Sequence, residues 1–227
     1  MKLPTSFTYA VRSLGRHTRR TILSVLGIGI GCGVCLVLVS FVQGEGEMMM
    51  RAAAESGTGH LQVVPEAWTK TRERNLRLPR WQTLREKLQE MDAVKVAAPR
   101  ARTEALLAFG TRTAGVEMVG VDPTVEPRIN RLVRKIESGS YLESGSEGTV
   151  VVGRAVARRL DVEVGDDLMV TVSGEDDEMR SAMLTIKGLV STGSKQLDAG
   201  LCQVTLDEVQ DLTGYGGAAE IAALVEH

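Results

Sequence analysis

An uncharged, apolar run near the N-terminus constrains this chain more than any other feature. Residues 21–44 contain no Asp, Glu, Lys or Arg. A helix with about 1.5 Å rise per residue would span about 36 Å over this run, and the hydrocarbon core of a bilayer is about 30 Å thick. The sequence therefore predicts one transmembrane helix at residues 21–44, flanked by a segment 1–20 and a large region 45–227.

Charge differs sharply between the two flanks of this run. The residues before it include Lys2, Arg12, Arg16, Arg19 and Arg20, whereas Glu45 and Glu47 follow it, with Arg51 nearby. The positive-inside rule then predicts a cytoplasmic N-terminus and an extracytoplasmic region 45–227. A cleaved signal peptide is the rival interpretation, with residues 52–54 as the cleavage region. The run is longer than the usual apolar segment of about 7–15 residues in a signal peptide, which favours an anchor.

Segment 1–20 has the pattern of a helix at a membrane surface. Phe7, Ala10, Val11 and Leu14 fall on one helical face. Such a helix is expected to lie along the inner surface of the membrane. The basic side chains Arg12, Arg16, Arg19 and Arg20 are expected to bind anionic lipid there or to touch a cytoplasmic partner.

Four glycines alternate inside the apolar run: Gly27, Gly29, Gly31 and Gly33. They form two overlapping GxxxG patterns, and such patterns let a second helix approach closely. The glycines predict packing against other transmembrane helices, and the simpler alternative is that small residues are tolerated there without purpose. Cys32 and Cys35 have the spacing of a redox motif, but we interpret them as small residues of the packed membrane helix.

The remaining composition excludes some classes of protein. The net charge is −2, the pI is about 6.0, and no basic surface is visible beyond residue 20, which argues against a nucleic-acid partner. Cys202 is the only cysteine outside the apolar run. No disulfide within the chain is therefore expected on that side of the membrane.

The region after the membrane helix mixes strand and helix patterns without regular alternation, which predicts an α+β fold. Strands are expected at 60–64, from 94 until Pro99 interrupts, and at 104–109, 115–121, 150–152, 168–173, 182–190, 203–206 and 221–225. Helices are expected at 80–91, at 153–160, and from a capping box at Thr205 and Glu208 through Leu212. Segment 124–137 is ambiguous, and 138–148 is predicted to be a loop.

No motif in the sequence predicts catalysis, a cofactor or a metal. Residues 188–195 resemble a phosphate-binding loop, but Ser194 and Lys195 are in the reverse order. The acidic run 175–178 lacks the ligand spacing of a calcium loop and is predicted to be a hairpin tip. Met48, Met49 and Met50 are expected to continue the membrane helix. No nucleophile elbow or zinc-protease motif is present, so an anchored enzyme is the least favoured class.

Several short motifs in order along the chain resemble a known family. They are Tyr9–Leu14 with Arg19-Arg20-Thr21, Gly59–Val63, Val119-Gly120-Val121-Asp122-Pro123, Val151-Val152-Gly153 with Ala157, Leu160 and Val164-Gly165-Asp166, and Lys187–Val190 with Gly193 and Asp198. Their order and spacing resemble permease subunits of the MacB/LolC/LolE/FtsX superfamily of ABC transporters, and the lipoprotein-releasing LolC/LolE type in particular. The resemblance implies a protein of the inner membrane whose region 45–227 is a periplasmic MacB-like core domain, with a possible division into two subdomains and incomplete at its C-terminus.

The same resemblance implies how such a protein works. ATP hydrolysis is expected on a partner ABC ATPase subunit, a second permease chain is expected in a homo- or heterodimer, and the outer domain relays motion to lipoprotein cargo or a periplasmic partner. Members of this family have three further membrane helices, which this sequence lacks, so we expect an N-terminal part or a truncated form. The alternative is a single-pass, membrane-anchored binding or adaptor protein without transport activity.

Overall fold

The structure is a computed structural model that describes residues 18–55, 61–68 and 76–225. It divides into two compact units, Met1–Arg51 and Ala52–His227. The first contains most of one long helix, α2. We call the second unit the core domain.

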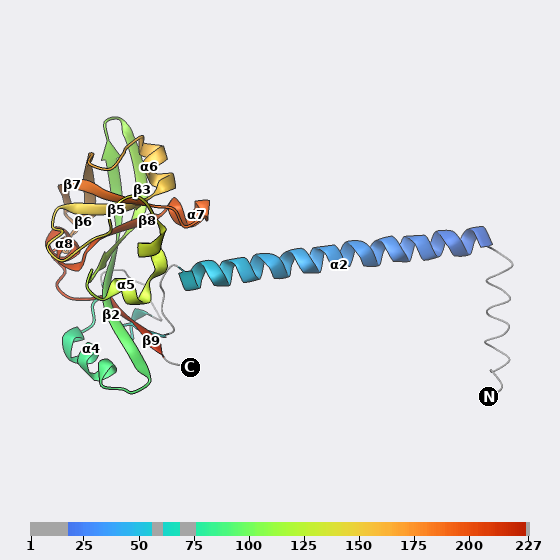
Figure 1. Ribbon diagram of the computed structural model, residues 1–227, viewed down its shortest axis with the longest axis horizontal. Coiled ribbons are helices and arrows are strands. Elements are labelled where there is room, and N and C mark those ends of the chain that lie inside the picture. The colour runs from blue at the N-terminus through green and yellow to red at the C-terminus, as the bar shows by residue number, and fades with distance from the viewer. Residues whose placement is uncertain (1–17, 56–60, 69–75, 226–227) are drawn as a thin grey trace. The chain divides into compact units, whose positions relative to one another are not determined.

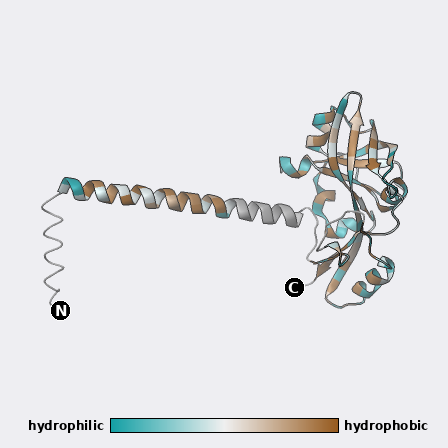
Figure 2. Cartoon of the chain, turned by 180° about the vertical axis from the view of Figure 1, so that it is seen from behind, coloured by the Kyte–Doolittle hydropathy of each residue, from teal (hydrophilic) through white to brown (hydrophobic). Residues whose placement is uncertain are grey.

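Helix α2 (Thr18–Glu55) confirms the expected N-terminal apolar helix. Its stretch Thr18–Gly44 is long and apolar enough to cross a membrane, and its most apolar window has no buried residue. Figure 2 shows hydrophobic residues along this stretch. A helix satisfies all its backbone hydrogen bonds internally, as a segment in hydrocarbon must. The helix continues past Gly44 through residues 48–50, as predicted.

The core domain confirms the α+β class (Figure 1). Its described residues include nine strands, which form one mixed sheet. The strands are β1 (Leu61–Val63), β2 (Val94–Phe109), β3 (Arg112–Val121), β4 (Ile136–Gly139), β5 (Thr149–Gly153), β6 (Asp167–Ser173), β7 (Met179–Val190), β8 (Leu201–Thr205) and β9 (Glu220–Val225). The helices are α4 (Trp81–Gln89), α5 (Glu126–Ile129), the 3₁₀ turn η1 (Arg131–Lys135), α6 (Arg154–Leu160), α7 (Lys195–Asp198) and α8 (Leu206–Thr213).

Six of the strands close into a barrel. The pairing runs β2–β3–β8–β5–β7–β6, and β6 returns to β2 through the pairs Ala105↔Val172 to Ala108↔Met169. The pairs β3–β8 and β5–β7 are parallel, and the others in the ring are antiparallel. Closure removes the free sheet edges that would otherwise need covering.

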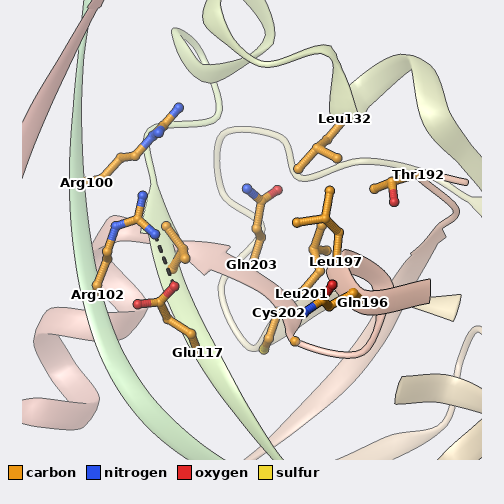
Figure 3. Close-up of a pocket in the computed structure, with 12 residues that line it drawn as sticks. Arg100, Arg102, Glu117, Leu132, Thr192, Gln196, Leu197, Leu201, Cys202 and Gln203 are labelled. Atoms are coloured by element: carbon orange, nitrogen blue, oxygen red, sulfur yellow. Dashed lines mark hydrogen bonds and ion pairs between the residues drawn. The ribbon is translucent and has the colours of Figure 1, made fainter. Parts of the chain in front are cut away.

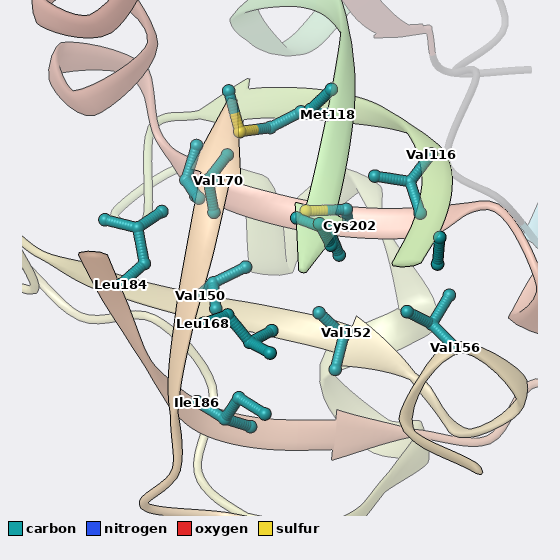
Figure 4. Packing of buried hydrophobic residues seen from close by; sticks show 14 of the residues in the cluster. Val116, Met118, Val150, Val152, Val156, Leu168, Val170, Leu184, Ile186 and Cys202 are labelled. Atoms are coloured by element: carbon teal, nitrogen blue, oxygen red, sulfur yellow. The ribbon is translucent and has the colours of Figure 1, made fainter. Parts of the chain in front are cut away.

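The barrel interior holds the largest hydrophobic cluster (Figure 4). Its side chains come from alternate positions of the strands, such as Leu168, Val170 and Val172 on β6. Leu160 of α6 and Val209 of α8 also belong to this cluster. Full burial of a leucine or valine side chain is worth about 1.5–3 kcal/mol, so this cluster dominates the stability of the core domain.

A smaller part of the core domain extends from the barrel along the first half of β2. There β2 pairs with β9, and β9 pairs in turn with β1. A separate hydrophobic cluster contains Leu78, Ala97 and Ile221, with Trp81 and Leu84 of α4 packed against it. Strand β2 therefore serves both parts, because its first half pairs with β9 and its second half pairs with β6.

The structure corrects two predicted boundaries. Strand β2 runs without a break through Pro99, which pairs with Ile221. Before Arg100, β2 has a paired neighbour on one side only, so a residue without an N–H group is tolerated there. The predicted loop 138–148 begins inside β4, whose Gly139 pairs with Gly188.

The predicted capping box is half formed. Thr205 Oγ1 accepts a hydrogen bond of 3.3 Å from the backbone N–H of Glu208, as a helix N-cap should. The Glu208 carboxylate accepts a hydrogen bond of 2.7 Å from the backbone N–H of Gly148. This side chain therefore ties the loop before β5 to the start of α8.

Candidate functional site

The four glycines of α2 form two separate faces. At about 100° per residue, Gly27 and Gly31 lie about 40° apart around the axis, while Gly29 and Gly33 lie on the nearly opposite side. A Cβ atom built on any of the four meets nothing within 4 Å. Both faces therefore expose backbone, and each has room for a neighbouring helix to approach closely.

The basic residues predicted to lie at the membrane surface are described in part. Arg12 and Arg16 lie outside the described residues. Arg19 and Arg20 lie exposed in the first described turn of α2, which contains no acidic residue.

In the Gly-Val-Asp-Pro segment at the end of β3, Gly120 and Asp122 have structural roles. A Cβ atom on Gly120 would lie 2.6 Å from Cγ2 of Val209, so glycine lets α8 pack directly on β3. The Asp122 carboxylate accepts hydrogen bonds from the backbone N–H and hydroxyl of Thr124, at 3.0 and 2.6 Å. Asp122 thereby sets the turn that leads into α5.

Two other motif residues, far apart in the sequence, meet at the end of β5. A Cβ atom on Gly153 would overlap the backbone carbonyl of Asp198 in α7. The buried Asp198 carboxylate accepts hydrogen bonds from the backbone N–H and hydroxyl of Thr192, at 2.8 and 2.7 Å. The glycine and the aspartate are thus two halves of one contact that closes loop 191–200 against the barrel.

A buried network of charges lies where β2 passes from β9 to the barrel. Arg100 is 1% exposed and donates to both carboxylate oxygens of Glu126, at 3.1 and 2.7 Å. Asn130 donates a third hydrogen bond to Glu126, at 3.0 Å. Arg102 bridges the carboxylates of Glu220 and Glu117, with shortest distances of 2.9 and 3.1 Å. The network joins α5, β2, β3 and β9.

This network forms one wall of a pocket of about 270 Å³. Figure 3 shows Arg102 and Glu117 on one side, with Leu132, Leu197 and Gln203 on the other. Burial opposes the charge of Arg102, but the carboxylates of Glu220 and Glu117 outweigh it and raise the pKa of the guanidinium. The pocket is therefore amphipathic, with a permanently charged wall facing apolar side chains.

A buried tyrosine lies close to the network. Tyr141 donates a hydrogen bond of 2.7 Å to Oε1 of Gln203. Burial, followed by the negative charge of Glu126, raises the pKa of the Tyr141 hydroxyl above its usual value. The hydroxyl is therefore a neutral donor that fixes Gln203, and it has no character of a base.

Sequence reasoning did not identify this network. The available signal was a pair of arginines, Arg100 and Arg102, at alternate positions in a strand that is rich in apolar residues. Such residues share one face of a strand, and charges on a largely buried face require partners. The partners Glu126 and Glu220 lie 26 and 118 positions from Arg100 and Arg102, so no local pattern connects them.

The phosphate-loop-like segment and the acidic run are both ordinary parts of the fold. Gly188 lies in β7 and Ser194 caps the four-residue helix α7, so the phosphate-loop-like segment does not open a long helix. The acidic run 175–178 forms the turn between β6 and β7, as predicted. Within the described ranges, no group of three His, Cys, Asp or Glu side chains is arranged to hold a metal ion.

Comparison with known proteins gives consistent matches. Residues 21–220 match the MacB-like periplasmic core domain. The chain is 26% identical over 179 residues to the lipoprotein-releasing system transmembrane protein LolE of Haemophilus influenzae, which covers 78% of this chain and 42% of that protein. It is 25% identical over 214 residues to LolC of Neisseria meningitidis, covering 90% of this chain and 48% of that protein. The chain thus spans less than half the length of these relatives.

A solved structure shows the same fold. The periplasmic region of MacB from Actinobacillus actinomycetemcomitans superposes with a TM-score of 0.52 and 13% sequence identity, covering 75% of this chain and 77% of that one. The structural likeness and the family match agree with each other. This chain therefore belongs to the family of MacB-like periplasmic core domains, carried here behind an N-terminal apolar helix.

Proposed function

We propose that this chain is the N-terminal part of an ABC-transporter permease of the lipoprotein-releasing or MacB-like type. The observation that carries the proposal is the family match over residues 21–220, which includes both the apolar helix and the core domain. Its relatives LolE and LolC are transmembrane proteins of lipoprotein-releasing systems. In this role α2 is anchored in the inner membrane and ATP hydrolysis takes place on a partner ATPase.

The connectivity of the core domain supports insertion between two membrane segments. The chain enters the core domain near β1, and β9 is the last strand that the structure describes; these two strands are paired from Leu61↔Ala223 to Val63↔Ile221. A domain inserted into a loop needs its two ends close together. Movement of one connection would be transmitted to the other through this pair, which suits a relay of motion to cargo or a periplasmic partner.

The proposed orientation places the N-terminus in the cytoplasm and the core domain outside. Its support is the basic flank before the apolar run and the acidic flank after it. The orientation can be tested with two cysteines, the native and buried Cys202 and a second one introduced at the exposed position of Glu175. Cys202 is fully buried, and burial raises the pKa of its thiol to about 12, whereas Glu175 is exposed in the turn after β6.

We expect a membrane-impermeant maleimide to label Glu175→Cys in intact spheroplasts and to leave Cys202 unlabelled. The protein used should also carry Cys32→Ala and Cys35→Ala, so that Cys202 is its one native cysteine. Cys202 should react only after denaturation, because the thiolate is the reactive form and burial disfavours it. If Glu175→Cys is labelled only after the membrane is permeabilised, the core domain lies on the cytoplasmic side and the proposed orientation is wrong. Labelling of native Cys202 would instead contradict the barrel packing.

The transporter role predicts that the two glycine faces bind partner helices. The chain should be purified from detergent-solubilised native membranes, and an ABC ATPase and a second permease chain should co-purify. Gly27→Ile with Gly31→Ile blocks one face, and Gly29→Ile with Gly33→Ile blocks the other. We expect at least one pair to reduce recovery of the partners about tenfold, which corresponds to about 1.4 kcal/mol.

The control for these variants is Leu36→Ile with Leu38→Ile, which keeps side-chain volume on the same helix. A wild-type preparation without an ATPase would refute the transporter role and favour the membrane-anchored adaptor. If the ATPase is recovered equally well with both glycine variants, the transporter role stands and the glycine faces are not the contact with the partner helices.

A further inference from the structure

The outer side of the barrel along β2, β6 and β7 exposes an apolar surface. Leu106, Met169, Met183 and Met179 are 45%, 47%, 59% and 67% exposed. Strand register places them along one outward face: Met169 pairs with Met183, Thr171 pairs with Leu106 and Ser181, and Ser173 pairs with Met179. We call these four residues the methionine face. Exposed apolar clusters of this kind commonly mark interaction sites, and methionine suits them because its side chain adapts to different partners.

A groove lies at the end of this surface that Leu106 and Met179 form. It has a volume of about 550 Å³ and is lined by Leu106, Gly115, Thr171, Ser173 and Met179, among others. Gly115 has no atom within 4 Å of a built Cβ, so the groove floor is open above β3. The groove can therefore receive an apolar side chain from a partner.

Acidic residues surround the methionine face. Glu104 and Glu117 line the groove on one side, and Asp167 begins β6 on the other. The turn 175–178, all Glu or Asp, joins the strands that carry Met169 and Met183. The outward positions of β6, of residues 179–185 on β7 and of residues 104–108 on β2 include no Lys or Arg. The field at this surface is therefore negative, although Arg102 and Arg180 offset Glu117 and Asp176 in part.

The charge pattern identifies the kind of occupant. A second copy of this face would bring two acidic rims together, and an anionic lipid surface would be repelled in the same way. A protein segment with apolar side chains between Lys or Arg residues would fill the groove and pair with the rim. We propose that the methionine face docks a basic, amphipathic segment of a partner protein. This proposal goes beyond the transport role, because such a face would serve an adaptor equally well.

The test measures binding to the full chain in nanodiscs of zwitterionic phosphatidylcholine. The probes are two fluorescent peptides of about eight residues, one strand in length, which alternate leucine with lysine or leucine with glutamate. Fluorescence anisotropy should show binding of the lysine peptide and none of the glutamate peptide. Binding should weaken between about 0.15 M and about 1 M salt, where the Debye length falls from about 8 to about 3 Å.

Variants locate the binding to the face. Met169→Ser with Met183→Ser should weaken binding of the lysine peptide about tenfold or more, because apolar contact area is lost. The matched control is Met91→Ser, which changes a methionine that is 55% exposed outside this face. For the rim, Glu175→Gln with Glu178→Gln should weaken binding, whereas Glu86→Gln with Glu90→Gln on and beside α4 should not. Unchanged tryptophan fluorescence establishes that each variant is folded.

Three results would overturn the proposal. The first is equal binding of the two peptides, which would mean apolar adhesion without charge recognition. The second is unchanged affinity in the variant with both methionines replaced. The third is self-association of the chain that Met169→Ser with Met183→Ser abolishes, which would assign the face to a second copy.

Discussion

Replacing Arg100 with methionine is expected to destabilise the core domain by about 3–5 kcal/mol. The substitution leaves the Glu126 carboxylate, which is 0% exposed, without the guanidinium that contacts both its oxygens. An unpaired buried charge is far more costly than the loss of a surface ion pair. Urea unfolding followed by tryptophan fluorescence measures the effect, because both tryptophans, Trp68 and Trp81, lie outside the membrane helix.

Two companion variants separate the buried charge from the loss of side-chain packing. Arg100→Met combined with Glu126→Gln should recover much of the lost stability, since glutamine is neutral and still accepts the hydrogen bond from Asn130. Arg112→Met removes an ion pair to Asp161 in which the side chains are 51% and 75% exposed, and it should cost about 1 kcal/mol or less. If Arg100→Met cost no more than Arg112→Met, the network would have no role in holding β2, β9 and α5 together.

Gly153→Ala is expected to destabilise the core domain by about 3 kcal/mol, the upper part of the usual range for overpacking. The new methyl group would overlap the backbone carbonyl of Asp198, and a backbone atom cannot move aside as the end of a flexible side chain can. Relief requires α7 to shift, which would strain the hydrogen bonds from Thr192 to the Asp198 carboxylate. The same urea unfolding measurement applies.

The matched control is Gly115→Ala. Gly115 also lies in a strand of the barrel, but an added Cβ atom meets nothing within 4 Å and its φ angle is not in the left-handed region. Its effect should stay within about 0.5 kcal/mol, as for most surface substitutions. Equal stability of the two alanine variants would mean that loop 191–200 is not held against β5 by this contact.

Many elements of the core domain could be predicted from local patterns. The hairpin β2–β3 turns at Gly110, whose φ of +57° suits glycine, and α4 follows the helical spacing of Trp81, Leu84 and Leu88. Pro99 misled the prediction because proline is read as a strand breaker, whereas the number of paired neighbours at that point decides whether it is tolerated. That number is a property of the whole sheet.

Some of the candidate sites can be recognised in the sequence, and others only in the tertiary structure. The glycines of α2 are visible in the sequence, because their spacing on a helix follows from the helix geometry alone. The methionine face is not visible, because Met169, Met179 and Met183 look like ordinary strand residues until the register shows that they point outward with Leu106. The Arg100–Glu126 pair was likewise hidden, because neither residue signals its partner.

The sequence by itself determined the apolar helix, the α+β class and most strand positions. These depend on hydrophobic periodicity and on the absence of charge, which act over a few turns of helix or one strand. Only the tertiary structure decided that β6 closes the barrel onto β2, that Gly153 meets Asp198, and that Arg100 and Arg102 lie among three carboxylate partners. Those contacts join residues far apart in the chain, and they depend on which faces fit together when the apolar surfaces are buried.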